Sequence, residues 1–207
     1  MGATSYTIQN VVASASLFAD VPLEKVATKL ANTEYNPEQF PGLVLRLTSL
    51  GITALVFSSG KIVVTGVKSE DGVPSAVKDI QKELNKAGIK FTKKPEMKVE
   101  NMVASGDIGL TLNLTDLAFN LPTAEYEPEQ FPGLVYKVPG WHITFLLFST
   151  GKIVCTGAKN EGEIKKAVAD LRKMLVGMKK GKEEKEAGIK KTKEEKEASA
   201  KKAKEEK

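Results

Sequence analysis

The sequence reads EYNPEQFPGLV at residues 34–44 and EYEPEQFPGLV at residues 125–135, 91 positions later. In each copy a phenylalanine, Phe40 or Phe131, stands between a glutamine and a Pro-Gly pair, which is a strong turn signal. No apolar run surrounds either ring, so each is expected on a loop. Because an aromatic side chain carries a large apolar area, the two loops predict that each ring is received by something outside the loop.

A direct repeat extends from this stretch in both directions. When residues 10–84 are aligned with residues 101–175 without a gap, 35 of the 75 pairs are identical. The other matching blocks are NVVAS with NMVAS, and LVFSSGKIVVTG with LLFSTGKIVCTG. A solenoid needs at least three stacked units, so two copies indicate a pseudo-dimer about an approximate two-fold axis. Such a body suits a target that is itself roughly two-fold, such as double-stranded DNA or a protein homodimer.

The order of elements is the same in both copies. Each begins with a strand and an amphipathic helix, continues through the loop into strands joined by tight turns, and ends in a second helix. This order predicts an α+β fold, with an antiparallel sheet and helices on one face. In the first copy the expected strands are 7–16, 43–48, 52–58 and 61–67, and the expected helices are 22–32 and 72–88.

Two residue patterns predict how helices begin. Pro22 is expected in the first turn of its helix, with Asp20 or Val21 as the N-cap. In the second copy, Asn160 and Glu163 have the spacing of a capping box, in which each side chain accepts from the other residue's backbone N–H.

The charge of the chain is unevenly distributed. The formal net charge of the 207 residues is +5, from 31 basic and 26 acidic side chains. Residues 179–207 contain 12 Lys and 8 Glu, which leaves 19 and 18 for the rest, so overall basicity says little about nucleic acid. The tail repeats KEEK without an apolar stripe and is expected to be a solvated, partly helical or disordered extension. Non-specific contact between the tail and DNA or an acidic partner is the alternative.

The sequence contains no recognisable catalytic set. Cys155 is the only cysteine and His142 the only histidine, so no internal disulfide, zinc site or Cys-His pair can form within one chain. No Gly-rich phosphate loop occurs, and we therefore expect a protein that is not an enzyme and needs no cofactor or metal. Cys155 is expected in the core, and Trp141 and His142 in a turn. Nothing indicates a membrane span or a signal peptide. The single cysteine favours an intracellular, cytoplasmic location.

Side chains in a strand alternate between the two faces of a sheet. One face is purely apolar, as expected under helices, and carries Ile52, Val56, Ile62 and Val64. The other face mixes apolar and polar side chains at matching positions in both copies, and we name it the mixed face. Its members are Asn10, Val12, Leu55, Phe57, Val63 and Thr65 in the first copy, and Asn101, Val103, Leu146, Phe148, Val154 and Thr156 in the second. The mixed face is either an exposed binding surface or a surface covered by self-association.

The repeated blocks, their spacing and the PEQFPGLV loop resemble the TATA-box-binding protein family. The resemblance covers residues 6–178, and the short stretch before the first repeat is similar to the archaeal form. It implies a saddle: a ten-stranded antiparallel sheet with helices on the convex side and the minor groove of DNA on the concave side. This family is itself a standard example of minor-groove kinking. The expected boundaries are 1–92 for the first repeat, 93–178 for the second and 179–207 for the tail.

The resemblance also implies roles for individual residues. Phenylalanine rings enter between base pairs at both ends of the site, and the matching residues are Phe40, Phe57, Phe131 and Phe148. The other side chains of the mixed face lie against the bases. A·T pairs offer only acceptors in the minor groove whereas G·C adds a donor, so this face suits A·T DNA. Phosphate contacts are expected from matched positions: Arg46, Ser59, Lys61 and Lys68, with Lys137, Thr150, Lys152 and Lys159.

The partners implied by the resemblance are promoter DNA, transcription factor B and RNA polymerase, which assemble as a preinitiation complex. Transcription factor B is expected on the second loop, at Glu127, Glu129 and Gln130. The family commonly has an apolar residue where Gln130 stands. The alternative function is a protein-interaction module that dimerises through its exposed apolar sheet face, which is the mixed face. A weak homodimer is also considered for the DNA-free state. An enzyme that uses the same fold as a nucleic-acid platform is a third class, against which the missing catalytic domain argues.

Overall fold

The computed structural model of the chain describes residues 4–181. Residues 182–207 of the expected tail therefore lie outside the described part. The first repeat contains β1 (Ser5–Ser16), α1 (Leu23–Lys29), β2 (Thr33–Glu34), β3 (Leu43–Leu47), β4 (Ile52–Val56), β5 (Lys61–Val67) and α2 (Val73–Lys86). The second contains β6 (Glu96–Asp107), α3 (Leu114–Asn120), β7 (Ala124–Glu125), β8 (Leu134–Lys137), β9 (Thr144–Leu147) and β10 (Lys152–Ala158), and residues 161–181 are helical.

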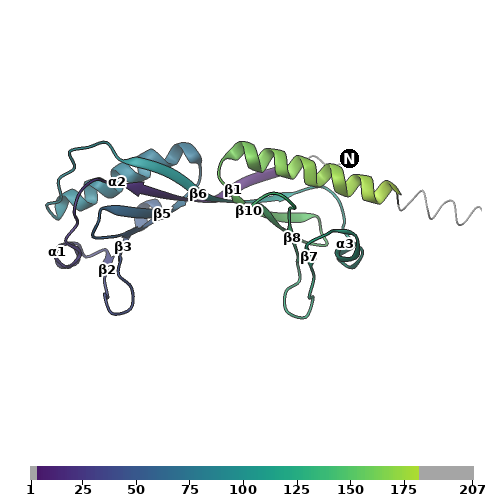
Figure 1. Cartoon of the computed structure of the whole chain (residues 1–207), viewed down its shortest axis with the longest axis horizontal. Helices are drawn as coiled ribbons and strands as arrows, with labels where there is room; N and C mark the ends of the chain where they lie inside the picture. Colours follow the sequence, from purple (N-terminus) through teal and green to yellow (C-terminus); the bar gives the residue numbers. More distant parts are fainter. Residues whose placement is uncertain (1–3, 182–207) are drawn as a thin grey trace, which may run out of the picture. The chain divides into compact units, whose positions relative to one another are not determined.

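The strands form one curved ten-stranded antiparallel sheet in the order β2-β3-β4-β5-β1-β6-β10-β9-β8-β7. The order reads the same from both ends, with the matching strands β1 and β6 paired at the centre, where Val12 lies opposite Asn101. Figure 1 shows this central pair and the loops after β2 and β7, which project from the same side of the sheet. The expected α+β architecture of two tandem repeats is confirmed.

The buried side of the sheet belongs to the core of each repeat. In the first repeat, Val77, Ile80 and Leu84 of α2 are completely buried, and α2 packs on β1 and β5. The strand residues beneath, such as Ala13 and Val64, are also completely buried. The spacing of three to four residues in α2 and of two in the strands is what brings one apolar face of each element together.

The start of α1 differs from the prediction. Pro22 is the N-cap itself, with an extended backbone (φ −72°, ψ 94°) and no side-chain hydrogen bond, rather than a residue of the first turn capped by Asp20 or Val21. The helix ends at Lys29, because Leu30 already has an extended backbone. With only seven residues, α1 depends on packing rather than on helix propensity.

Several strand boundaries were predicted wrongly. β4 ends at Val56, so Phe57 follows the strand, and β1 begins at Ser5 rather than at residue 7. The two-residue strands β2 and β7 have no alternation long enough to be recognised. They form because Glu34 lies opposite Val44 of β3, and Glu125 lies opposite Val135 of β8.

The capping box at residues 160–163 is only half formed. The Asn160 Oδ1 accepts from the Glu163 N–H at 2.9 Å, as predicted. However, the Glu163 carboxylate accepts from the backbone N–H of Lys159, not from that of Asn160. The whole sheet belongs to one compact unit, which ends at Lys166. In the described part of the chain, no helix has the length and apolarity required to cross a membrane.

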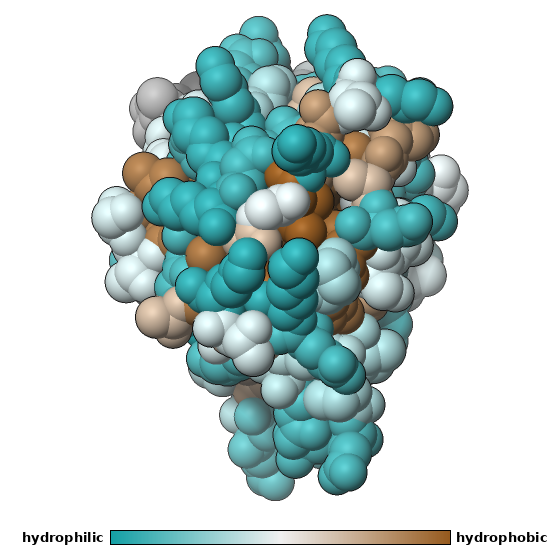
Figure 2. Space-filling view, turned by 90° about the vertical axis from the view of Figure 1, so that its left-hand side faces the viewer, coloured by the Kyte–Doolittle hydropathy of each residue, from teal (hydrophilic) through white to brown (hydrophobic). Residues whose placement is uncertain are grey.

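The end of the sheet carried by the first repeat exposes some apolar surface. Figure 2 views the molecule from this end and shows hydrophobic residues set among hydrophilic ones. Phe18, in the turn after β1, is 40% exposed, and the Lys93 ammonium lies 5.6 Å from its ring centroid. Phe18 also has a positive φ of 52°, whereas its matching residue is a glycine, Gly109, with φ 66°.

Candidate nucleic-acid interface

The mixed face of the sheet is partly exposed along both repeats. Val12, Leu55 and Val63 are half-buried, and so are their matches Val103, Leu146 and Val154. In contrast, the alternate residues of the same strands, such as Val11, Ala54 and Val64, have no exposed surface. The division into an apolar core face and a mixed face is therefore confirmed.

A polar cluster recurs at the middle of the mixed face. Asn10 Nδ2 donates to Thr65 Oγ1 at 3.0 Å, and the Gly66 N–H donates to Asn10 Oδ1 at 2.8 Å. The matching cluster is Asn101 with Thr156 and Gly157, with the distances 3.3 Å and 2.8 Å. The backbone N–H fixes which way each amide points. Because an amide nitrogen carries two hydrogens and one is used on the threonine, the other remains for an acceptor on this face.

A pair of phenylalanines stands at each end of the mixed face. The Phe40 and Phe57 ring centroids are 5.8 Å apart at 66°, and those of Phe131 and Phe148 are 5.9 Å apart at 67°, both edge-to-face. Phe40 and Phe131 remain 38% and 37% exposed. A glycine two residues after each loop phenylalanine explains how the Phe40 and Phe131 rings pack back against Phe57 and Phe148. A Cβ at Gly42 would lie 2.5 Å from a Phe40 ring carbon, so only glycine leaves room for the ring there.

Three of the basic residues expected to contact phosphate have partners within the protein. Arg46 forms an ion pair with Glu34 at 3.0 Å, and Lys137 forms one with Glu125 at 2.8 Å. The hydrogen bond and charge of Arg46 hold the pKa of Glu34 below its ordinary value. Lys68 Nζ donates to the Gln9 carbonyl at 2.7 Å. The sequence predicted that these basic residues line the binding surface but did not reveal their partners within the protein.

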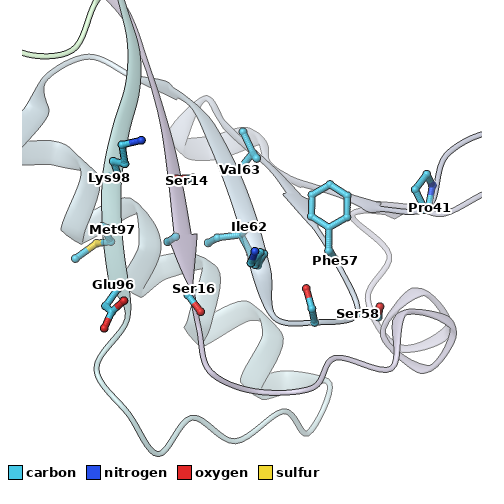
Figure 3. A pocket seen from close by; sticks show the side chains of 13 residues that line it. Ser14, Ser16, Pro41, Phe57, Ser58, Ile62, Val63, Glu96, Met97 and Lys98 are labelled. Atoms are coloured by element: carbon cyan, nitrogen blue, oxygen red, sulfur yellow. The ribbon is translucent and has the colours of Figure 1, made fainter.

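The remaining expected phosphate contacts come from the β4–β5 and β9–β10 hairpins and from the residue after β10. They are all exposed: Ser59, Lys61, Thr150, Lys152 and Lys159. In the first repeat, Ser59 and Lys61 line a shallow hollow of about 750 Å³ on the mixed face. Figure 3 shows that β1, β5 and β6 contribute side by side to this hollow, through Ser14, Val63 and Lys98.

The loop expected to bind a protein partner is exposed and carries a higher negative charge than its match. Glu127, Glu129 and Gln130 are all exposed, and Glu127 replaces Asn36 of the first loop. The backbone is the same in both loops, since the Phe131 N–H donates to the Glu127 carbonyl and the Phe40 N–H to the Asn36 carbonyl.

Sequence reasoning missed two groups of surface residues. Phe119 on α3 is 86% exposed, and its position in the first repeat is occupied by Thr28. Two serines, a glutamine and a glutamate also hydrogen-bond across the central strands: Gln9 with Ser105, and Ser14 with Glu100. Their only sequence signal was that Gln9 and Glu100 each precede the repeated asparagine.

The residues with reactive side chains have structural roles here. Cys155 is buried on the core face, and burial raises the pKa of its thiol to about 11, which makes the reactive thiolate scarce. His142 Nε2 lies 3.1 Å from a Glu163 oxygen, and the Lys166 ammonium lies 5.1 Å from the Trp141 ring centroid. Among the described residues, no group of three or more His, Cys, Asp or Glu side chains could hold a metal ion.

The family model described as "Transcription factor TFIID (or TATA-binding protein, TBP)" matches the chain twice, over residues 5–87 and 96–178. The chain belongs to this family. It is 49% identical to a TATA-box-binding protein of Thermococcus kodakarensis over 168 residues, which cover 81% of this chain and 88% of that protein. It is 47% identical to that of Pyrococcus furiosus over 175 residues, 84% of this chain and 92% of the relative. The structure of Methanococcus jannaschii TBP matches with a TM-score of 0.78 and 44% identity, covering 84% of this chain and 99% of that one. The expected resemblance to an archaeal family member is thus confirmed.

Proposed function

We propose that this protein is a general transcription factor that binds the TATA box through the mixed face of its sheet. The observation that carries the proposal is the repeated cluster of Asn10 with Thr65 and of Asn101 with Thr156, set in a half-buried apolar face. Two donor clusters flanked by valines suit the A·T minor groove, which offers acceptors and no guanine amino group. We infer that Asn10, Val12, Leu55, Val63 and Thr65 contact the bases of one half-site, and that their matches contact the other.

The phenylalanine pairs would act as wedges. Phe40 and Phe131 are exposed on loops whose prolines restrict the backbone, so little conformational entropy is lost when a ring inserts. Each ring already contacts a second phenylalanine, Phe57 or Phe148, that could enter the same step. Unstacking a base step costs a few kcal/mol, which the larger contact with bent DNA offsets.

The matched basic residues would bind the DNA backbone. Arg46 and Lys137 would exchange a carboxylate partner for a phosphate, and both existing ion pairs are well exposed and therefore contribute little stability. Lys61, Lys68, Lys152 and Lys159, with Ser59 and Thr150, would add contacts along both strands. These contacts make binding dependent on salt.

The second loop would recruit the next factor. We propose that transcription factor B docks on Glu127, Glu129 and Gln130, and that RNA polymerase then joins the assembly. The support is the charge difference between two loops with the same backbone, because only the second carries Glu127. No cofactor or catalytic step is part of this proposal.

A gel-shift experiment tests the function. A duplex with a TATA box should bind at low concentration, while a duplex with the box replaced by G·C pairs should bind at least 100-fold more weakly. The alternative, a module that dimerises through the mixed face, predicts no difference between the duplexes. It also predicts a dimer in sedimentation that added TATA duplex does not dissociate. A dimer of that kind with no TATA preference would overturn the proposal.

A further inference from the structure

Each central strand contains one residue that its partner strand skips. The pairing of β1 with β6 passes from Ile8 to Asn10 without using Gln9, and from Asn101 to Val99 without using Glu100. The two extra residues are 91 positions apart, so the two bulges are related by the repeat. A bulge re-aims a side chain, and here it brings the residue before each central asparagine onto the mixed face.

The bulge residues hydrogen-bond to two serines that are also related by the repeat. Gln9 Nε2 donates to Ser105 Oγ at 2.8 Å, and Ser14 Oγ donates to Glu100 Oε1 at 2.7 Å. We name these the Gln9–Ser105 pair and the Ser14–Glu100 pair. They occupy equivalent positions on either side of the central asparagines, but their hydrogen bonds run in opposite directions.

The direction of each bond decides what the pair can offer to a ligand. In the Gln9–Ser105 pair, the serine accepts, so its own proton and the second amide hydrogen of Gln9 remain as donors. In the Ser14–Glu100 pair, the only serine proton is already given to the carboxylate, and both residues present acceptors. The hydrogen bonds from Ser14 and Lys98 hold the pKa of Glu100 below its ordinary value, so the carboxylate is ionised at neutral pH.

The positive groups around Glu100 offset its negative charge but leave lone pairs on the carboxylate that can accept further hydrogen bonds. Lys98 Nζ lies 3.2 Å from Glu100 Oε2 and replaces Thr7 of the first repeat, and Lys159 also acts on the carboxylate. The Lys98 side chain is 68% exposed, so its ammonium is free to bind a DNA phosphate while the Ser14–Glu100 pair faces the minor groove.

The two pairs therefore match different base pairs. A·T pairs present only acceptors in the minor groove, and these fit the Gln9–Ser105 pair. The guanine amino group is the one donor of the minor groove, and it fits the Ser14–Glu100 pair. We propose that Glu100 is a specificity-determining residue, which accepts a hydrogen bond from guanine and lets one half of the site tolerate a G·C pair that the other half rejects.

A consequence of this inference, which rests on the proposed function, is a preferred orientation on DNA. In a palindromic A·T box with one off-centre G·C pair, the protein places the guanine against Glu100. Orientation would then be set by a residue of the sheet before any protein partner binds.

The experiment uses the full chain with four sequences at the bulges: the natural one, Glu100→Gln, Gln9→Glu and the double exchange of both. The double exchange keeps the net charge and only moves the carboxylate to the other half. Orientation is read from DNA cleavage by a reagent attached through Glu38→Cys, an exposed loop position, while the buried Cys155 stays unreactive. Affinities are measured for the all-A·T box and for the box with one G·C pair.

The natural protein should cleave on one side of the G·C box, and the double exchange should cleave on the other. Glu100→Gln should lose the preference and bind the G·C box about 10-fold more weakly relative to the all-A·T box. Gln9→Glu should also lose the preference, because both halves then accept guanine. An orientation that the double exchange leaves unchanged would overturn the inference. An equal gain in affinity of Glu100→Gln for both boxes would also overturn it, because the carboxylate would then act only by repelling the DNA phosphates. If the natural protein fails to bind the all-A·T box, it is the proposed function that fails.

Discussion

The two repeats have nearly the same geometry but differ in chemistry at particular places. The phenylalanine pairs differ by 0.1 Å and 1°, and the bond from the Gly66 or Gly157 N–H to its asparagine is 2.8 Å in both. The differences gather elsewhere: Gln9 against Glu100 in the bulges, Asn36 against Glu127 in the loops, and Thr28 against Phe119 on the short helices.

The positions of these differences indicate which surfaces are common to both repeats and which are specific to one repeat. A two-fold ligand constrains both halves equally, so residues that meet it stay the same or similar after a duplication. A single protein partner contacts one half only, so its contacts are expected where the repeats differ outside the mixed face. The differing bulge residues Gln9 and Glu100 lie on the mixed face and are assigned to DNA. The asparagine and phenylalanine clusters are common to both repeats, as expected for contacts with DNA. The loop at Glu127 and the helix bearing Phe119 are specific to the second repeat, as expected for contacts with a protein partner.

Replacing the phenylalanines that we propose as wedges tests the surface common to both repeats and should have the largest effect on DNA affinity. Phe40→Ala and Phe131→Ala should each weaken binding to a TATA duplex by a few kcal/mol, the cost of an unaided kink. The losses should be equal within error, because the two ring pairs have the same geometry. Binding is measured by fluorescence anisotropy.

Mismatched pairs at the two end steps provide the control, since less unstacking remains to be done there and the loss should shrink. Circular dichroism should show that both variants fold, because the rings are exposed. If Phe40→Ala unfolds the protein, the ring is part of the core and the shared surface must be assigned again.

Reversing the charge of one glutamate on the second loop tests the surface that is specific to the second repeat. Glu129→Arg should spare DNA binding but abolish recruitment of transcription factor B, because it places a cation in the acidic loop. The matched change Glu38→Arg should spare both. Recruitment is measured as a supershift of the DNA complex, and equal effects of the two variants would show that the loops do not divide the partners.

Salt dependence gives a smaller test, of the basic residues. Six matched phosphate contacts predict that log affinity falls with log salt at a slope of roughly −5, and that each Ala replacement flattens the slope by about 1. Arg46→Ala and Lys137→Ala should have the same effect, because both exchange a carboxylate for a phosphate. A slope near zero would remove the phosphate assignment from both repeats.

The smallest effect concerns a contact present only in the second repeat. The Lys159 N–H, with His142, lowers the pKa of Glu163, whereas the matching residue Gly72 has no side chain. A folded-state pKa below the unfolded value gives stability above the unfolded pKa, and this stability is lost as pH falls through the folded pKa. Glu163→Gln should therefore lower the free energy of unfolding slightly at pH 7 and not at acidic pH. Urea denaturation at both pH values checks this, and a pH-independent difference would contradict it.

The sequence alone was sufficient for the repeat, the fold class and the two faces of the sheet. These follow from local periodicity: alternation separates Val63 from Val64, and the 91-residue repeat doubles every assignment. The loops of Phe40 and Phe131 were also predictable, because proline and glycine restrict the backbone wherever they stand.

Tertiary structure decided what depends on pairing between distant segments. Gln9 and Glu100 reach the mixed face only because the register of β1 and β6 skips them, and alternation within one strand cannot show a bulge. The partners Glu34 and Glu125 were hidden for the same reason, since two-residue strands exist only when β3 and β8 supply their hydrogen bonds. Local periodicity records which face of an element is apolar, while the contacts across the sheet depend on a register that is set by the whole fold.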